Sequence, residues 1–380
     1  MQEFLSKDQR KWLEDTFTRL TKKISATSVR VGEQIPYIAQ NGRYTEDWGT
    51  HDIAWWTNGF WAGILWQMYH ATGEEQYKDQ ARITEERLDR ALEEFEGLHH
   101  DVGFMWMHSA VADYRLTGEQ KSKVRGHHAA NIMAGRFNPL GKYIRAWNWD
   151  MAGWMIVDCL MNLSILYWAT EEFDDPRFAA IAKLHADTTL EKVLREDGSS
   201  NHILILDPNT GEVCEKPAGQ GYAEGSSWSR GQSWAVYGMA ISYSHTKDDK
   251  YLEAAKRCAH YFIENVSKTD YLPLCDFRAP EEPVIYDSTA GACAACGLLE
   301  IAKYVPEEEK DFYRQSALKI LMSMDEHFCN WKEEEDGILY YGRVAYHQDE
   351  ADNSGVSIIY GDYFYTEAIL RLMEKDFYIW

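Results

Sequence analysis

The sequence predicts an all-α fold, an (α/α)6 barrel of six helical hairpins with long loops over one end. Six segments rich in bulky apolar or small residues have the pattern of helices that are buried on all sides. In the first five, a short polar turn and an amphipathic helix carrying Lys, Arg and Glu follow. A helix that is apolar all round must be enclosed by other elements, and a ring of outer amphipathic helices encloses it.

The first hairpin begins with residues 59–70 (GFWAGILWQMYH), which are apolar around most of a helix. Gly73 stops this helix, and residues 74–95 resume with an amphipathic pattern. The starts of successive units are separated by 44, 55, 73, 58 and 72 residues, which is too irregular for a strict solenoid. The later units start at Gly103, near Asp158, at Gly231, at Thr289 and at Gly361, and residues 9–24 supply the helical partner of the sixth.

A long insert precedes the fourth buried helix, at residues 199–227. Within it, residues 202–206 (HILIL) have a β-like pattern and residues 207–211 (DPNTG) form a turn signal. Loops of this length in a compact fold are usually functional, and we expect them to open onto the N-terminal ends of the inner helices. No change in composition divides the chain, so we expect one domain over residues 1–380.

The charge of the chain is strongly acidic: 39 Lys and Arg stand against 61 Asp and Glu in 380 residues, a formal net charge of -22. This argues against nucleic acid as a partner and against a membrane surface, since both require clustered positive charge. No apolar run approaches the roughly 18–20 residues that span a bilayer, and residues 1–8 have no apolar core of a signal peptide. The odd number of cysteines, seven, favours a reducing, cytoplasmic compartment.

Aromatic residues, a His or Arg, and a carboxylate recur at the predicted starts of the inner helices. Sugar rings present flat C–H faces to aromatic side chains, and their hydroxyls need well-placed hydrogen bonds. The repeated pattern at one end of the barrel therefore indicates a sugar site, although any single Trp could instead belong to the core.

Asp158 and Asp101 are the candidate catalytic residues. Asp158 interrupts an apolar run, where a carboxylate is rarely found unless it is paired or used. Desolvation would raise its pKa, as a proton donor near neutral pH requires. Each residue could alternatively cap a helix, but together they permit acid/base chemistry on glycosides.

Other chemistries have weaker support in the sequence. The pairs His99–His100 and His127–His128 lack zinc-ligand spacing, and Cys293 and Cys296 lie in a small-residue stretch that is typical of helix packing. There is no Gly-x-Gly-x-x-Gly or Walker-type loop, and no Gly-x-Ser-x-Gly. We therefore expect no metal, no cofactor and no serine nucleophile.

Several motifs, in order, resemble the unsaturated glucuronyl hydrolases, glycoside hydrolase family 88. The resemblance covers roughly residues 40 to 372, and the bacterial members of that family are (α/α)6 barrels. The motifs are WTNGFW (56–61), LHHDVGF (98–104), IVDCLMN (156–162), SSWSRGQSW (226–234), DSTA (287–290) and GDYFY (361–365).

The resemblance implies an enzyme that releases a 4,5-unsaturated uronic acid from the non-reducing end of lyase-generated oligosaccharides, such as glycosaminoglycan disaccharides. Asp158 matches the family's catalytic aspartate, which protonates C4 so that water adds at C5, and Asp101 matches a second required aspartate. Arg230 and Gln220 are expected to bind the uronate carboxylate. The positions that match substrate contacts are Trp56, His100, Trp147, His202, Gln220, Arg230 and Trp234.

Two further expectations concern the charge of the site and one departure from the family. Since the substrate is an anion and the chain is acidic, the site should be locally positive, with Arg230, His100 and His202 as its cations. Gly219 stands where the family commonly has a His, so a polar contact to the substrate would be missing.

Three other functions remain open from the sequence: a family 105-like hydrolase of unsaturated rhamnogalacturonan or ulvan fragments, an inverting glycosidase on saturated sugars, and a non-catalytic sugar-binding protein.

Overall fold

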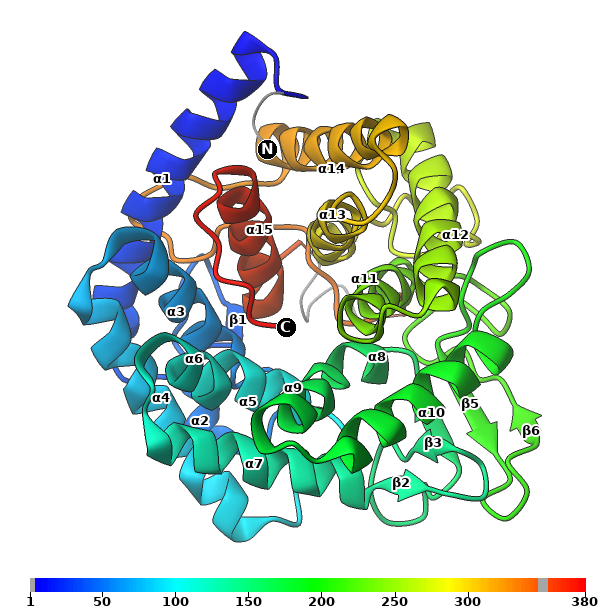
Figure 1. Ribbon diagram of the computed structural model, residues 1–380. Helices are drawn as coiled ribbons and strands as arrows, with labels where there is room; N and C mark the ends of the chain where they lie inside the picture. The colour runs from blue at the N-terminus through cyan, green and yellow to red at the C-terminus, as the bar shows by residue number, and fades with distance from the viewer. Residues whose placement is uncertain (1–3, 348–354) are drawn as a thin grey trace.

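The computed structural model describes residues 4–347 and 355–380 and has the predicted architecture of two concentric rings of helices (Figure 1). Each inner helix packs against the next, and the last, α15, packs against the first, α3, so the inner ring is closed. The inner ring consists of α3 (Phe60–Thr72), α5–η2–α6 (Val102–Trp106, Met107–Val111, Ala112–Thr117), α8–α9 (Cys159–Asn162, Ser164–Phe173), α11 (Ser229–Thr246), α13 (Ser288–Ile301) and α15 (Ile359–Leu372).

The outer ring surrounds these helices, and each outer helix packs on an inner neighbour (Figure 1). As predicted, the N-terminal helix α1 partners α15, so the two ends of the described chain close the barrel together. The outer helices are α1 (Lys7–Val31), α4 (Glu75–Glu94), α7 (Gln120–Gly135), α10 (Pro176–Lys192), α12 (Asp249–Val266) and α14 (Glu307–His327).

The burial pattern explains why the two rings differ. Every residue of α13 is buried, whereas α4 buries only one face of its 20 residues. Cys293 and Cys296 are both buried inside α13, and the Cys296 thiol donates to the Phe364 carbonyl oxygen of α15 at 3.2 Å, so Cys296 packs the contact between α13 and α15. No helix among residues 4–347 and 355–380 has the length and apolar character needed to cross a membrane.

Short strands hold the loops at the end where the inner helices begin. The predicted β-like segment is β5 (Ile203–Leu206), which pairs antiparallel with both β4 (Trp154–Ile156) and β6 (Val213–Glu215). The predicted turn follows β5, where the Gly211 amide donates to the Asp207 carbonyl at 2.7 Å. The remaining short elements are α2 (Trp48–His51), η3 (Ser267–Thr269), the pair β1 (Ile38–Ala39) and β7 (Ser357–Ile358), and the pair β2 (Phe137–Asn138) and β3 (Tyr143–Ile144).

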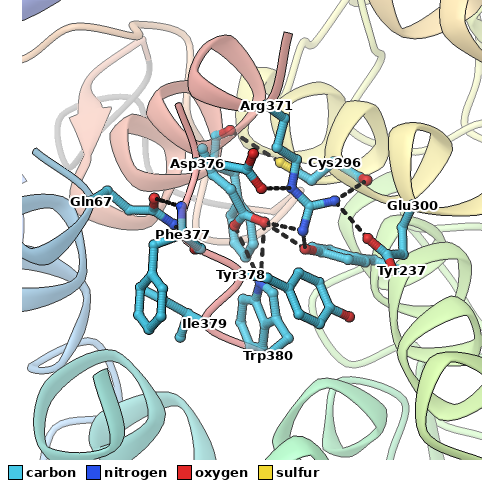
Figure 2. Close-up of polar contacts among 12 residues, drawn as sticks. Gln67, Tyr237, Cys296, Glu300, Arg371, Asp376, Phe377, Tyr378, Ile379 and Trp380 are labelled. Carbon is cyan, nitrogen blue, oxygen red and sulfur yellow. Dashed lines mark hydrogen bonds and ion pairs between the residues drawn. The ribbon is translucent and has the colours of Figure 1, made fainter. Parts of the chain in front are cut away.

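Residues 377–380 close the opposite end of the barrel from inside. Trp380 is fully buried, its ring stacks on Phe364, and its indole N–H donates to both carboxylate oxygens of Glu367 at 3.2 Å (Figure 2). Arg371, also buried, forms ion pairs with Glu300 at 3.0 Å and Glu367 at 2.7 Å. The axis of the barrel is therefore filled by aromatic rings and a buried ionic network.

Candidate active site

A cavity of about 180 Å³, room for about six water molecules, lies at the end of the barrel where the inner helices begin. Of the nine site residues predicted from the sequence, all except His202 line it. The lining comprises Trp55, Trp56, His99, His100, Asp101, Trp147, Ile156, Asp158, Gln220, Trp228, Arg230 and Trp234.

The small sheet places Asp158 on the wall of this cavity. Asp158 comes two residues after β4, and the Val157 amide donates to the His202 carbonyl oxygen at 3.1 Å, extending the β4–β5 pairing. Helix α8 then begins at Cys159, so the backbone turns sharply at the aspartate. A strand end followed directly by a helix start projects the Asp158 side chain, which is 17% exposed, into the cavity.

His100 connects the two predicted catalytic carboxylates. Its Nε2 lies 2.9 Å from Asp158 Oδ1 and 3.3 Å from Asp101 Oδ1, while its Nδ1 lies 2.8 Å from the Ala146 carbonyl oxygen. A carbonyl oxygen only accepts, so Nδ1 carries a proton, and an ionised carboxylate at Nε2 requires a second one. His100 is therefore held as an imidazolium between Asp101 and Asp158.

The alternative role of these aspartates as helix caps does not fit the geometry. Asp158 and Asp101 occupy the N-cap positions of α8 and α5, but neither side chain accepts a capping hydrogen bond. Both carboxylates instead turn toward His100.

Asn162 is a contact that the sequence reasoning missed. Its Nδ2 donates to Asp101 Oδ1 at 2.9 Å, and its Oδ1 accepts from the Phe104 amide at 2.6 Å. It lies four residues after Asp158, on the same face of the helix. This i,i+4 spacing from a candidate catalytic acid could have identified Asn162 from the sequence.

Burial sets the protonation of this cluster. Desolvation raises the pKa of Asp101 from 3.8 to about 7, and the nearby Asp158 charge adds to the effect, although His100 and Asn162 oppose it. Burial alone would lower the pKa of His100, but the charges of Asp101 and Asp158 outweigh it and raise that pKa. Near neutral pH Asp101 and His100 therefore hold their protons more readily than the same side chains would in water.

These shifts predict a pH dependence of stability. The raised Asp101 pKa means that the folded state binds more protons than the unfolded state between about pH 4 and about pH 7, and the raised His100 pKa extends this excess above pH 6.5. The free energy of unfolding contributed by the cluster should consequently fall as pH rises through this range. Urea unfolding of the wild type and of Asp101→Asn, measured at several pH values, should show a smaller decline in the variant. An equal or steeper decline in Asp101→Asn would contradict the assignment.

Aromatic side chains form the walls and floor of the cavity. Trp56 stacks on Tyr360 with ring centroids 5.0 Å apart and is half-buried, so one face remains accessible. Trp147 meets the His100 ring edge to face at 5.8 Å. Trp234 is only 2% exposed and packs on Phe104 at 5.4 Å, so it contributes to the floor.

Arg230 lies between the Trp228 and Tyr360 rings, 4.4 and 4.9 Å from their centroids. Its Nη1 donates to Asp287 at 3.1 Å, to Thr289 at 3.1 Å and to the Arg343 carbonyl oxygen, and its Nη2 donates to the Val344 carbonyl oxygen at 2.8 Å. The guanidinium thus brings a positive charge to the cavity, but both Nη groups already hold protein acceptors.

The prediction that His202 is a cation is wrong. Burial lowers the pKa of His202 to about 4, and no carboxylate lies within hydrogen-bonding distance of its ring among the described residues. Its Nδ1 accepts from the Gln220 amide at 3.1 Å, so the neutral ring positions the backbone of Gln220. His202 lines a much smaller adjoining pocket, of about 10 Å³, next to Arg195 and Lys216.

Gly219 has a structural reason to be glycine in this chain. Its φ is +61°, and a Cβ there would overlap the His202 ring and meet Ile203 Cδ1 at 2.7 Å. The His202 ring therefore fills the space that a side chain at position 219 would enter.

We expect Gly219→His to lower kcat/KM by about 10-fold, because the left-handed backbone costs about 1 kcal/mol and His202 must move. Gly225→Ala is the matched control: Gly225 has φ +77° and nothing within 4 Å of an added Cβ, so it tests backbone strain without overlap. Michaelis–Menten kinetics on both variants measure the effect, and an unchanged or improved Gly219→His would show that no overlap exists.

Four other lining residues were not among the nine predicted from the sequence, although each lies next to or within two residues of one that was: Trp55, His99, Ile156 and Trp228. Donor atoms of His99, His100 and Asp101 lie within 4.8 Å of one another, as metal ligands would. However, His99 Nδ1 accepts from the Asp101 amide at 3.4 Å and His100 Nε2 faces two carboxylates, so these atoms already bond to one another. The arrangement of His99, His100 and Asp101 suits the sharing of protons between these side chains.

Comparison with known proteins agrees with this geometry. Residues 28–244 match the sequence profile of Glycosyl Hydrolase Family 88. An unsaturated glucuronyl hydrolase from Bacillus sp. (strain GL1) is 34% identical over 353 residues, covering 90% of this chain and 92% of that protein. An unsaturated chondroitin disaccharide hydrolase from Streptococcus pneumoniae is 34% identical, covering 83% of this chain and 81% of that one.

Solved structures of similar proteins support the same family. The crystal structure of the unsaturated glucuronyl hydrolase from Bacillus sp. GL1 matches with a TM-score of 0.89 at 32% identity, over 95% of this chain and 96% of that one. An unsaturated glucuronyl hydrolase specific for heparin matches with a TM-score of 0.85 at 30% identity, over 96% and 97%. The chain therefore belongs to glycoside hydrolase family 88 and is an enzyme of that family.

Proposed function

We propose that this enzyme releases a 4,5-unsaturated uronic acid from the non-reducing end of glycosaminoglycan-type disaccharides by hydrating the C4=C5 enol ether. The observation that carries the proposal is the cluster of Asp101, His100 and Asp158 on the wall of an aromatic cavity. The relatives named for unsaturated glucuronyl and unsaturated chondroitin substrates support the substrate class.

In this mechanism Asp158 gives its proton to C4, and positive charge develops at C5 and the ring oxygen. Water adds its oxygen to C5 and returns a proton to the Asp158 carboxylate. The C5 hemiketal opens by breaking the bond from C5 to the ring oxygen, and C1, now a hemiacetal, releases the aglycone sugar as an alcohol. His100 Nε2, which lies 2.9 Å from Asp158 Oδ1, can pass its proton to the Asp158 carboxylate before the transfer to C4.

The spacing of the carboxylates disfavours direct inverting hydrolysis. Oxygens that lie 2.9 and 3.3 Å from one nitrogen can be at most about 6 Å apart, whereas inverting glycosidases hold their carboxyl groups about 6.5–9.5 Å apart to admit a water. Both aspartates contact the same nitrogen of His100, so they lie side by side rather than across the cavity from each other.

The uronate carboxylate has two suitable partners. The Gln220 side chain lines the cavity, and its backbone is fixed by His202 and by the Tyr346 amide at 2.8 Å. Arg230 contributes positive charge behind it. Trp56 and Trp147 are placed to contact the faces of the sugar rings.

Loss of the ultraviolet absorbance of the conjugated C4=C5 acid tests the proposal directly. We expect the absorbance to fall when the enzyme is mixed with unsaturated disaccharides of chondroitin, hyaluronan or heparin. Faster turnover of unsaturated uronyl-rhamnose or ulvan fragments would assign a family 105-like activity, and persistence of the absorbance on every substrate would overturn the proposal. Reaction in deuterated water should place deuterium at C4.

We further propose a cytoplasmic location, because all seven cysteines are free thiols and five of them are fully buried with raised pKa values. Immunodetection in fractionated cells of the source organism tests it, and recovery in the culture medium would contradict it.

A further inference from the structure

Arg136, immediately after α7, lies outside the cavity lining and outside every motif that led to the site. It is half-buried, and burial lowers its pKa to about 10. Within the described part of the chain, none of its hydrogen-bond acceptors is a carboxylate. A buried guanidinium without a paired anion is costly, so its contacts require an explanation.

All three nitrogen groups of Arg136 bind the two segments that carry His100 and Trp147. Its Nε donates to the Arg145 carbonyl oxygen at 2.9 Å, and its Nη2 donates to those of Ala146 and Trp147 at 3.0 and 2.9 Å. Its Nη1 donates to the Asn148 side chain at 2.8 Å and more weakly to the Leu98 carbonyl oxygen at 3.4 Å. One planar group therefore ties four consecutive residues of the Trp147 loop to the segment preceding His100.

The Ala146 carbonyl oxygen is the point where this contact reaches the catalytic cluster. The same oxygen accepts from Arg136 Nη2, from His100 Nδ1 at 2.8 Å and from the His100 amide at 3.3 Å. The bond to Nδ1 sets the rotation of the imidazole, and this rotation directs Nε2 toward Asp158 and Asp101. Displacing Ala146 would consequently displace His100 from both carboxylates.

We propose that Arg136 is a positioning residue for the reaction, holding the Ala146 carbonyl that orients His100 while fixing the Trp147 wall of the cavity. The inference rests on the proposed function, since it concerns the same cluster. A misplacement of about 1 Å in such a site costs on the order of 100-fold in rate.

The effect on protonation follows from the surroundings of His100. Loss of the Arg136 charge removes a cation near Asp101, so the protonated form of Asp101 becomes more favourable. The titratable and charged groups around His100 are His99 and Asp101 on its own segment, Arg136 after α7, Asp158 and Cys159 at the start of α8, and His185 on α10.

The test compares Arg136→Gln and Arg136→Lys with Arg115→Gln. Arg115 is a matched control because its Nη1 also binds three backbone carbonyls, those of Tyr378, Ile379 and Trp380, but at the far end of the barrel. We expect kcat/KM to fall about 100-fold in Arg136→Gln, with an intermediate loss in Arg136→Lys, a raised apparent pKa in the pH–rate profile, and partial rescue by added guanidinium ion. Arg115→Gln should lower thermal stability but leave the pH–rate profile unchanged and show no rescue.

Histidine-labelled ¹⁵N NMR provides a readout that is independent of turnover. The His100 resonances, assigned by their loss in His100→Gln, should show two protonated nitrogens near neutral pH in the wild type and an altered titration in Arg136→Lys. The positioning role would be overturned if the wild type turned over substrate and both Arg136 variants kept the wild-type kinetics and the wild-type His100 resonances. Absence of wild-type turnover on every unsaturated substrate would overturn the proposed function, while the NMR comparison would still decide the role of Arg136.

Discussion

Replacing Asp158 by Asn is expected to lower kcat by at least about 1,000-fold, within the range that general acid–base groups contribute, with substrate affinity changed only a few-fold. Asn keeps the shape of Asp, and its carbonyl oxygen can still accept from His100 Nε2, now 2.9 Å from Asp158 Oδ1. It cannot, however, give a proton to C4 or take one from water. Single-turnover kinetics on an unsaturated disaccharide, together with calorimetric binding, separate the two effects.

The control for charge alone is Asp311→Asn, since Asp311 is 71% exposed on the outer helix α14. It should leave both kcat and affinity unchanged. If Asp158→Asn retained more than a tenth of wild-type turnover, another group would have to be the acid. If both the wild type and the variant bound the disaccharide without turnover, the protein would be a sugar-binding protein.

Arg371→Met should lower the free energy of unfolding by about 3–5 kcal/mol, the usual cost of breaking a buried ion pair. The variant leaves the buried Glu367 carboxylate without its cation and the buried Glu300 carboxylate with Lys303 alone, at 2.8 Å, and it removes the donor to the Tyr237 hydroxyl (Figure 2). Met fills a similar volume, so the loss reflects charge and hydrogen bonding rather than a cavity. Urea denaturation followed by circular dichroism measures it.

Arg177→Met provides the comparison, because Arg177 is 58% exposed and its pair with Asp175 lies at the surface. Exposed pairs contribute about 0–1 kcal/mol, so this variant should remain close to the wild type. Adding Glu367→Gln to Arg371→Met should recover part of the loss by removing one unpaired charge. Equal stability of the two Arg→Met variants would show that the buried network does not stabilise the barrel.

The sequence was sufficient for the ring of helices because burial imposes a simple pattern. Residues 59–70 are apolar around most of a helix, residues 74–95 are apolar on one face, and the structure places them in the inner and outer rings as α3 and α4. The same logic identified Asp158, since an acidic residue inside an apolar run is costly unless it is used.

The states of the site residues could not be read from the sequence because they depend on neighbours far away in the chain. His100 and His202 have the same ordinary pKa and both are buried, but two carboxylates outweigh burial at His100 whereas burial dominates at His202, so their pKa values shift in opposite directions. Arg136 has no motif at all, because its acceptors, apart from the Asn148 side chain, are main-chain carbonyls, which every residue type supplies. Contacts to main-chain carbonyls therefore cannot be recognised from the residue types in the sequence.

The stacking of Trp56 on Tyr360 has a consequence for how the protein acquires activity. These two rings are 304 positions apart along the polypeptide, so the wall of the cavity belongs to the contacts of highest sequence separation. During synthesis on the ribosome, the first hairpin, α3 and α4, emerges long before α15, which is its last neighbour in the ring. The apolar faces that pack on α15 therefore stay uncovered until α15 meets α1 and closes the barrel. Folds with many such contacts tend to be slow to form and to expose apolar surface on the way. Nascent chains released before residue 360 should therefore be inactive and chaperone-bound, although five of the six hairpins are already complete.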